Sequence, residues 1–142
     1  MPRIKIELPE KFSFKTEIPV RISDINYGGH LGNDAILTIM HEARMQFLKS
    51  INCTELDLFG VSVIQADTAI VYKSEGFYGD ILVCEVTPGD FSRAGFDLYY
   101  RFTNKTTGKE IAHAKTGMMC FDYDERKVVS VPQEFVKLFD AI

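Results

Sequence analysis

The 142-residue sequence lacks the features that mark several large classes of protein. No apolar run approaches the roughly 20 residues that a membrane-spanning helix needs. The first twelve residues, MPRIKIELPEKF, have no apolar core of the kind found in signal peptides. There is also no long basic run, and the formal net charge is −4, so we expect binding to neither nucleic acid nor an anionic membrane.

Cysteine is scarce, with three residues, Cys53, Cys84 and Cys120, and no CxxC pair. An odd count without ligand spacing predicts reduced thiols in a cytoplasmic protein. Cys84 and Cys120 lie in apolar segments and are expected to be buried and inert. His, Cys and carboxylate residues do not cluster at metal-ligand spacing, and neither GxGxxG after a strand nor a P-loop occurs. We therefore expect no metal and no cofactor.

What remains has the composition of one globular domain over residues 1–142. Hydrophobic residues make up 46% and charged residues 25%, which suits a soluble chain with a real core. No internal repeat or linker divides the chain.

The most informative stretch covers residues 24–50. It begins with a loop that holds three glycines and His30, and continues as an apolar run at helical spacing. Asn33 or Asp34 is expected to cap this helix. The buried stripe is predicted at Ile36, Met40, Ala43 and Phe47, widened by Leu37, Ile39 and Leu48, with Glu42, Arg44, Gln46 and Lys49 on the polar side.

Strand patterns flank this helix on both sides. Alternation over residues 12–22 predicts a half-buried strand, in which Pro19 indicates an edge position or a bulge. Four closely spaced strands are predicted at 61–73, 81–87, 96–102 and 109–122, and closely spaced strands pair antiparallel. Pro132 predicts the start of a short closing helix. The order is typical of an α+β fold in which one sheet covers one apolar helix.

The start of the long helix is where chemistry is most plausible. The first N–H groups of a helix have no partner within it, and the macrodipole makes that end positive. Such a place can hold a carbonyl oxygen that gains negative charge. An ordinary loop with His30 as a surface histidine explains the same spacing, so the residues alone leave both interpretations open.

The segment DINYGGHLGNDAILTIMHEAR resembles the signature of the hotdog-fold thioesterases of the 4-hydroxybenzoyl-CoA thioesterase-like group. That signature runs D-x-D-x-x-G-H-x-N-N and continues into a helix that ends in E-A-R. The matching residues are Asp24, Gly29, His30, Asn33 and the run Glu42-Ala43-Arg44. The second Asp of the signature, which is the catalytic carboxylate in many members, is Asn26 here.

The resemblance implies a hotdog fold, in which a curled antiparallel five-stranded sheet wraps around one long central helix and a short C-terminal helix follows. It also implies a homodimer or homotetramer that pairs through strand 61–73, because exposed strand edges invite pairing. The substrate would be an acyl-CoA, bound at the helix start between two subunits.

The implied catalytic residues are Asn26, His30 and Asp24, with Glu75 and Glu42 as further candidates. Glu75 enters because Tyr72-Lys73-Ser74-Glu75 is similar to the Y-R-R-E segment of plant acyl-carrier-protein thioesterases. Glu42 is expected to be a buried carboxylate of the central helix. The implied substrate-binding residues are Gly28, Gly29, Leu31, Gly32 and Asn33.

The predicted activity is hydrolysis of an acyl-CoA thioester to free acid and CoA. A non-catalytic acyl-CoA-binding module is the first alternative, because an amide at position 26 cannot take a proton as a carboxylate can. An acyl-carrier-protein thioesterase and a hotdog-type hydratase or dehydratase are the others. Lys73, Arg93, Arg101 and Lys105 are available to bind the phosphates of a CoA arm.

Overall fold

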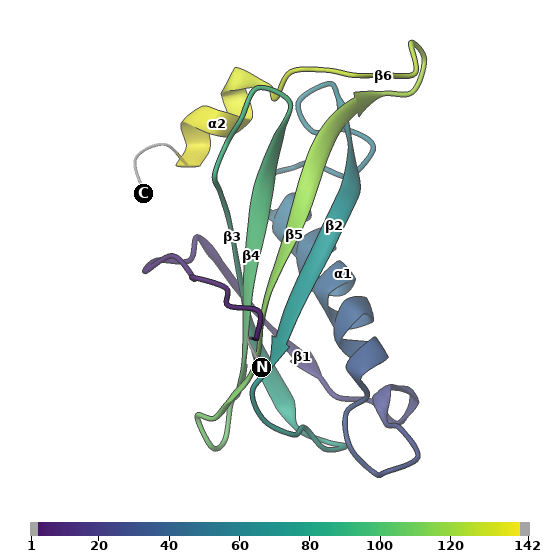
Figure 1. Ribbon diagram of the computed structural model, residues 1–142, viewed down its shortest axis with the longest axis vertical. Helices are drawn as coiled ribbons and strands as arrows, with labels where there is room; N and C mark the ends of the chain where they lie inside the picture. The colour runs from purple at the N-terminus through teal and green to yellow at the C-terminus, as the bar shows by residue number, and fades with distance from the viewer. Residues whose placement is uncertain (1–2, 140–142) are drawn as a thin grey trace.

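A computed structural model describes residues 3–139 of the chain (Figure 1). Its elements in order are β1 (Phe14–Pro19), a 3-10 helix (Ile22–Asp24), α1 (Asn33–Ser50), β2 (Ser62–Tyr72), β3 (Ile81–Gly89), β4 (Gly95–Asn104), β5 (Glu110–Asp122), β6 (Lys127–Val128) and α2 (Gln133–Phe139). The long helix, the closing helix after Pro132 and the four strands that follow the helix are therefore confirmed.

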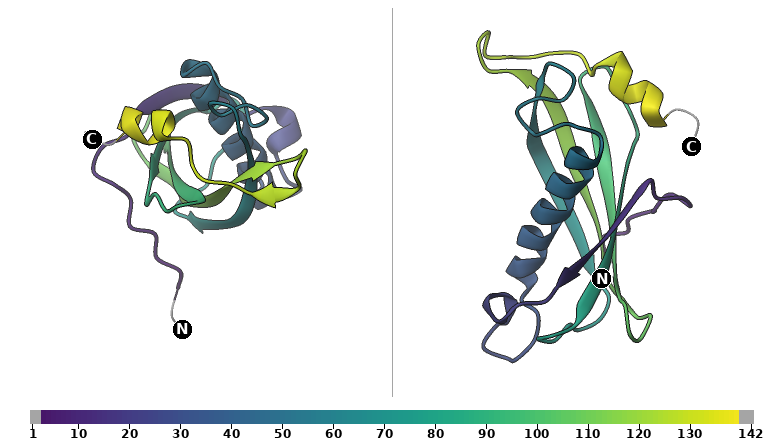
Figure 2. Two further views of the ribbon diagram at one scale, coloured as in Figure 1. Left: turned by 90° about the horizontal axis from the view of Figure 1, so that it is seen from above. Right: turned by 180° about the vertical axis from the view of Figure 1, so that it is seen from behind.

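The strands form one antiparallel sheet in the order β1-β3-β4-β5-β2. The two-residue β6 pairs with the end of β5 and was not predicted. Seen from above, the sheet curls around α1, which runs along its concave side (Figure 2). The predicted fold class, a curled sheet around one central helix, is confirmed.

The core lies between α1 and the inner face of the sheet. Ile36, Met40, Ala43 and Phe47 of α1 are each at most 2% exposed, as the helical spacing predicts. They pack with inner-face residues of the sheet such as Tyr100 into one hydrophobic cluster.

Two predictions about the faces of α1 are wrong. Leu37, expected in the buried stripe, is 47% exposed, and Arg44, expected on the polar side, is only 5% exposed. The physical reason is the position of the helix, which packs mainly over β1 and β3. The flank of α1 that faces β2 is therefore open at Leu37, while Arg44 extends inward beneath the helix.

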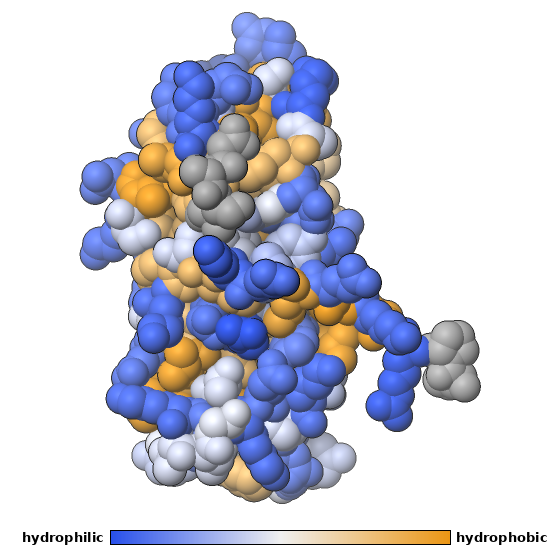
Figure 3. All heavy atoms as spheres, turned by 90° about the vertical axis from the view of Figure 1, so that its left-hand side faces the viewer, coloured by the Kyte–Doolittle hydropathy of each residue, from blue (hydrophilic) through white to orange (hydrophobic). Residues whose placement is uncertain are grey.

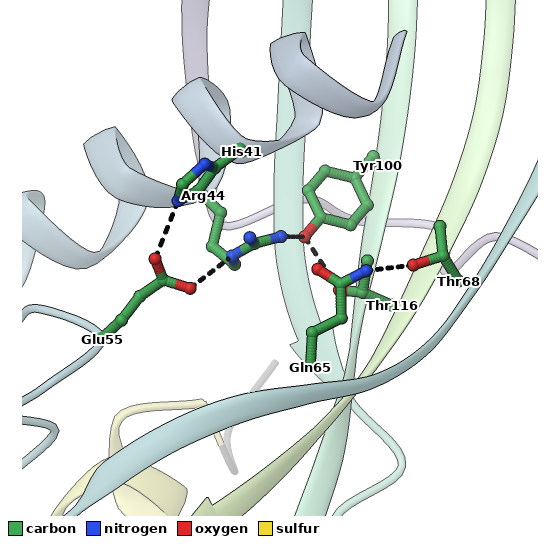
Figure 4. Close-up of polar contacts among 7 residues, drawn as sticks. All are labelled: His41, Arg44, Glu55, Gln65, Thr68, Tyr100 and Thr116. Atoms are coloured by element: carbon green, nitrogen blue, oxygen red, sulfur yellow. Dashed lines mark hydrogen bonds and ion pairs between the residues drawn. The ribbon is translucent and has the colours of Figure 1, made fainter. Parts of the chain in front are cut away.

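Arg44 is accommodated by a polar chain that crosses the core (Figure 4). Its Nε donates to Glu55 over 3.1 Å, and its guanidinium NH1 donates to the Tyr100 hydroxyl over 3.2 Å. The Tyr100 hydroxyl also hydrogen-bonds Thr116 over 2.9 Å, and His41 pairs with the other oxygen of Glu55. A buried charge is tolerated only when it is paired and hydrogen-bonded, and this chain meets that condition.

Glu42 is not the buried carboxylate that the sequence suggested. It is exposed and accepts a hydrogen bond from Gln46, one helical turn later, over 3.0 Å. Four residues separate the two side chains, so they lie together on the solvent side of α1.

The predicted strand at 12–22 is shorter in the structure, because the chain turns into the 3-10 helix at Ile22. Ile22, which the alternation placed on the core side, is 71% exposed as a result. The indication from Pro19 is correct, since β1 is an edge strand of the sheet.

The start of α1 also differs from the prediction. Gly32 is the N-cap residue and no side chain caps the helix, so neither Asn33 nor Asp34 has that role. A Cβ atom at Gly32 would lie 2.6 Å from the Asp34 carboxylate, so any other residue there would displace that side chain.

The face of the molecule that carries α2 and the N-terminal segment is mainly hydrophilic, and its apolar patches are separated by polar side chains (Figure 3). Within residues 3–139, no helix is both long enough and apolar enough to cross a membrane.

We expect Tyr100→Phe to lower the free energy of unfolding by about 1 to 3 kcal/mol, because it leaves Arg44 and Thr116 without a shared buried partner. Tyr123→Phe removes the same atom from a side chain that is 50% exposed and serves as the control. Urea unfolding of both variants tests this. If the two variants had the same free energy of unfolding, the buried hydrogen bonds of Tyr100 would contribute nothing to stability.

Candidate active site

Asp24 anchors the loop that leads into α1. The residue is only 5% exposed, and its carboxylate accepts hydrogen bonds from the backbone N–H and the guanidinium of Arg21, at 2.8 Å and 3.2 Å. The hydrogen bond and charge of Asp24 raise the pKa of Arg21. The backbone carbonyl of Asp24 accepts a hydrogen bond from the N–H of Gly32 over 2.9 Å. Asp24 thus ties the 3-10 helix to the start of α1.

Asn26 shapes the tip of the same loop. Its Oδ1 atom accepts hydrogen bonds from the N–H groups of Gly28, over 2.9 Å, and His30, over 3.2 Å. The backbone N–H of Asn26 donates to the carbonyl of His30, and Gly29 takes a φ of 81°, which glycine adopts without strain. The side chain therefore fixes a tight turn that presents His30.

A second loop, between β2 and β3, is held against the first. The N–H of Leu31 donates to the carbonyl of Gly76 over 2.7 Å. A Cβ atom at Gly76 would lie 3.1 Å from the side chain of Leu31, so a larger residue would press the loops apart.

This contact brings His30 and Glu75 together, although 44 residues lie between them in the sequence. The Nδ1 atom of His30 lies 3.1 Å from Oε2 of Glu75, and the ring of His30 lies against Phe77 with centroids 5.3 Å apart. The side chains of His30 and Glu75 are 36% and 64% exposed, so the pair is accessible to a ligand.

The pair borders a cavity of about 460 Å³ at the start of α1. Its lining comes from the loop before α1, from the first turn of α1, from the end of β2 and from the loop that follows. The lining residues are Asn26, Tyr27, Gly28, His30, Leu31, Asn33, Ile36, Tyr72, Lys73, Ser74, Glu75, Gly76 and Ile111. Tyr72, Gly76 and Ile111 were not predicted, because their contribution depends on how the two loops meet.

The helix start offers hydrogen-bond donors, but not at the glycines. The N–H groups from Gly29 to Gly32 all have acceptors within the two loops. In residues 3–139, the first N–H groups of α1 without an acceptor are those of Asn33 and Asp34. Asn33 lines this cavity, whereas Asp34 lines a neighbouring one, so the positive end of the helix dipole reaches the wall of the cavity at Asn33.

A family model described as "Thioesterase-like superfamily" matches residues 20–139. The chain belongs to this superfamily. A search among curated proteins found no match.

Solved structures agree with the hotdog fold of that superfamily. A 1,4-dihydroxy-2-naphthoyl-CoA thioesterase from Synechocystis matches with a TM-score of 0.81 and 21% identity over 91% of this chain and 96% of its own. A DHNA-CoA thioesterase from Staphylococcus aureus matches with a TM-score of 0.76 and 20% identity over 89% and 86%. A thioesterase-superfamily protein from Jannaschia matches with a TM-score of 0.82 and 17% identity over 92% and 83%. Together with the family match, they support thioester hydrolysis as the general activity.

Within this thioesterase-like chain, Glu42 lies away from the loop before α1 and the loop after β2. It borders a separate cavity of about 420 Å³ between α1 and β1, together with Arg21 and Thr38. Of the five candidate catalytic residues, the structure brings Asn26, His30 and Glu75 to one cavity, places Asp24 behind them and separates Glu42.

The four cations proposed for a phosphate differ in position. Lys73 lines the cavity, whereas Arg101 pairs with Glu85 on the outer face of the sheet and Lys105 pairs with Glu17. Arg93, which lies between β3 and β4, contacts Ser130, which follows β6. Lys73 is therefore the candidate that the fold places at the site.

The other two histidines have partners elsewhere, His41 with Glu55 and His113 with Glu110. The hydrogen bond from His113 lowers the pKa of Glu110. No group of His, Cys, Asp and Glu in the described part of the chain is arranged to hold a metal ion.

The three cysteines are free and buried, as was expected for Cys84 and Cys120. Burial raises the pKa of Cys84 to about 12 and that of Cys120 to about 11, so the nucleophilic thiolate is scarce at neutral pH. Burial raises the pKa of the third thiol, Cys53, as well.

We therefore expect iodoacetamide at pH 8 to modify the native thiols slowly and to leave activity unchanged. Unfolding in guanidinium should expose all three thiols to rapid modification. Mass spectrometry before and after unfolding tests this. Rapid labelling of a native thiol that removes activity would instead point to a cysteine in the site.

Proposed function

We propose that the chain hydrolyses an acyl-CoA thioester at the cavity beside His30 and Glu75. The observation that supports this most is the 3.1 Å contact between these two side chains, at a cavity that is also lined by Asn33, the first residue of α1. Activated water and oxyanion stabilisation are the two things that thioester hydrolysis needs.

The thioester carbonyl lies at the start of α1 in this proposal. Its oxygen accepts a hydrogen bond from the N–H group of Asn33, and the helix dipole stabilises the negative charge that develops there.

His30 acts as the base and Glu75 orients it. With its Nδ1–H donated to Glu75, the imidazole keeps a lone pair on Nε2 that can accept a proton from water. The water oxygen then bonds to the carbonyl carbon, the C–S bond breaks, and the thiolate of CoA recovers the proton from Nε2.

Asn26 positions these groups and does not accept the proton. Its side-chain oxygen, Oδ1, already accepts hydrogen bonds from the N–H groups of Gly28 and His30, which fixes the turn that carries the base. Asp24 supports the same loop through Arg21 and Gly32.

CoA is the favoured carrier because two similar structures are described as CoA thioesterases, and because Lys73 can pair with a phosphate at the cavity. The three free cysteine thiols of the chain suit a reducing compartment such as the cytoplasm. Asn26 at the position of the usual carboxylate favours the second candidate, an acyl-CoA-binding module without catalysis.

We expect His30→Ala to lower kcat by roughly 10² to 10⁴, the usual contribution of a general base. Glu75→Gln should cause a smaller loss, because the amide still holds the ring but no longer stabilises its charged form. Steady-state hydrolysis across a panel of acyl-CoAs with a free-thiol reporter measures both effects.

Glu42→Gln is the matched control, because it makes the same change as Glu75→Gln at the separate cavity. Its rate should equal the wild-type rate. Full activity in both His30→Ala and Glu75→Gln would sink the proposal. Binding of acyl-CoA without thiol release across the whole panel would favour the binding module.

We further propose a homodimer in which β2 strands of two copies pair at their edges. In the described residues, β2 bonds to β5 on one side and has no partner strand on the other. An edge of eleven residues is a strong site for strand pairing.

We expect sedimentation equilibrium at micromolar concentration to give about twice the 16.1 kDa chain mass, or four times that mass if dimers pair. Dimerisation through the edge adds hydrogen bonds that the monomer leaves to water. A monomer mass at these concentrations would contradict the pairing.

A further inference from the structure

Tyr72 is the last residue of β2 and its side chain reaches the start of α1. Tyr72 pairs with Ala112 of β5, which is fully buried in the core, so the Tyr72 side chain lies on the inner face of the sheet. The end of β2 and the start of α1 lie at the same end of the molecule (Figure 1). There the Tyr72 hydroxyl donates to the backbone carbonyl of Asn33 over 3.3 Å.

This hydrogen bond is long, and the helix does not need it. An O–H···O hydrogen bond normally measures about 2.5 to 3.0 Å between oxygens. The carbonyl of the first residue of an α-helix accepts the N–H of the residue four positions later, which is Leu37 here. Tyr72 is also 48% exposed. The phenol is therefore held beside α1 by a weak contact, and its hydroxyl is free to turn towards a ligand.

Tyr72 is the hydroxyl side chain best placed to meet a ligand at the start of α1. Among the described residues, Tyr27, Tyr72 and Ser74 bring hydroxyl groups to the cavity. Ser74 donates to the carbonyl of Glu110 over 2.6 Å, and Tyr27 is fully exposed in the loop before α1. The hydroxyl of Tyr72, by contrast, contacts the same residue, Asn33, whose N–H group is a free donor at the cavity.

The proposed oxyanion position benefits from a second donor. Asn33 supplies one N–H group to this cavity, whereas the next residue, Asp34, lines a neighbouring cavity. Oxyanion sites combine several donors aimed at the oxygen that gains charge, and tyrosine side chains are among the groups that serve in this way. A phenol hydroxyl donates one hydrogen bond.

We propose that Tyr72 is a further catalytic residue, whose hydroxyl donates to the thioester carbonyl oxygen together with the N–H of Asn33. When water adds to the carbonyl carbon, the C=O electron pair moves to this oxygen and both hydrogen bonds strengthen. Tyr72 keeps its proton, and the C=O bond forms again as the C–S bond breaks. This inference rests on the proposed function, because it assumes that the thioester carbonyl lies at the start of α1.

The proposed pairing of two copies leaves this side chain in place. Pairing uses the backbone edge of β2 that faces away from β5. The Tyr72 side chain lies on the inner face instead and points to α1.

Tyr72→Phe tests the proposal, because it removes the hydroxyl and keeps the ring. We expect kcat to fall by roughly 10²- to 10³-fold with a much smaller change in KM, since the oxyanion forms only after the substrate is bound. Tyr78→Phe removes the same atom from a side chain that is 66% exposed and lies outside the cavity lining, so it should keep the wild-type rate. Steady-state hydrolysis of the acyl-CoA panel measures both variants.

Infrared spectroscopy of bound hexanoyl-CoA, labelled with carbon-13 at the thioester carbonyl, separates contact with the substrate from simple anchoring of α1. The His30→Ala variant keeps the probe intact during the measurement. We expect its carbonyl band to lie at a lower frequency than in the double variant His30→Ala, Tyr72→Phe, because a hydrogen bond weakens the C=O bond. The same band in both variants would overturn the inference even if Tyr72→Phe lowered kcat, since Tyr72 would then act only by holding Asn33.

The two measurements also distinguish this inference from the proposed hydrolysis. If the wild type releases no thiol but the carbonyl band still depends on Tyr72, the hydroxyl binds the thioester and the proposed hydrolysis fails. If thiol is released and neither kcat nor the band depends on Tyr72, hydrolysis stands and this inference fails.

Discussion

The hydrogen bond from the N–H of Leu31 to the carbonyl of Gly76 is the contact on which the site depends. It joins the loop before α1 to the loop after β2, two segments that no strand pairing connects. The missing side chain at Gly76 allows the loops to approach, since a Cβ atom would meet Leu31 at 3.1 Å. The His30 and Glu75 side chains meet as neighbours of this contact. The proposed site therefore depends on a backbone contact between two loops at the start of α1.

The second constraint is that one helix covers only part of a curled sheet. The helix spans 18 residues and packs mainly over β1 and β3, so on the inner face of β2 Val63 is buried while Thr68 and Ile70 are only half-buried. This geometry buries Arg44 and exposes Leu37, against the simple expectation from their polarity. Burial of Arg44 requires partners, which Glu55 and Tyr100 supply.

The sequence was informative wherever local periodicity decides the structure. The stripe through Ile36, Met40 and Phe47 predicted the buried face of α1, and alternation predicted the four strands after it. It was less informative where distant segments meet. Nothing local distinguishes Leu37 from Met40, and the meeting of His30 and Glu75 depends on loops far apart in the sequence. The motif led to both residues, but their 3.1 Å contact required the fold.

Position 26 shows how the loop conformation limits the chemistry. The side-chain oxygen of Asn26 accepts two backbone N–H groups, from Gly28 and His30. An aspartate in the same conformation would receive these hydrogen bonds on its carboxylate, and hydrogen bonds to the charged form favour that form and weaken the base. An amide serves the turn equally well and adds no negative charge near Glu75. The proposed transfer of the proton-accepting role to His30 is consistent with the replacement, because the loop keeps its shape and carries His30 at its end.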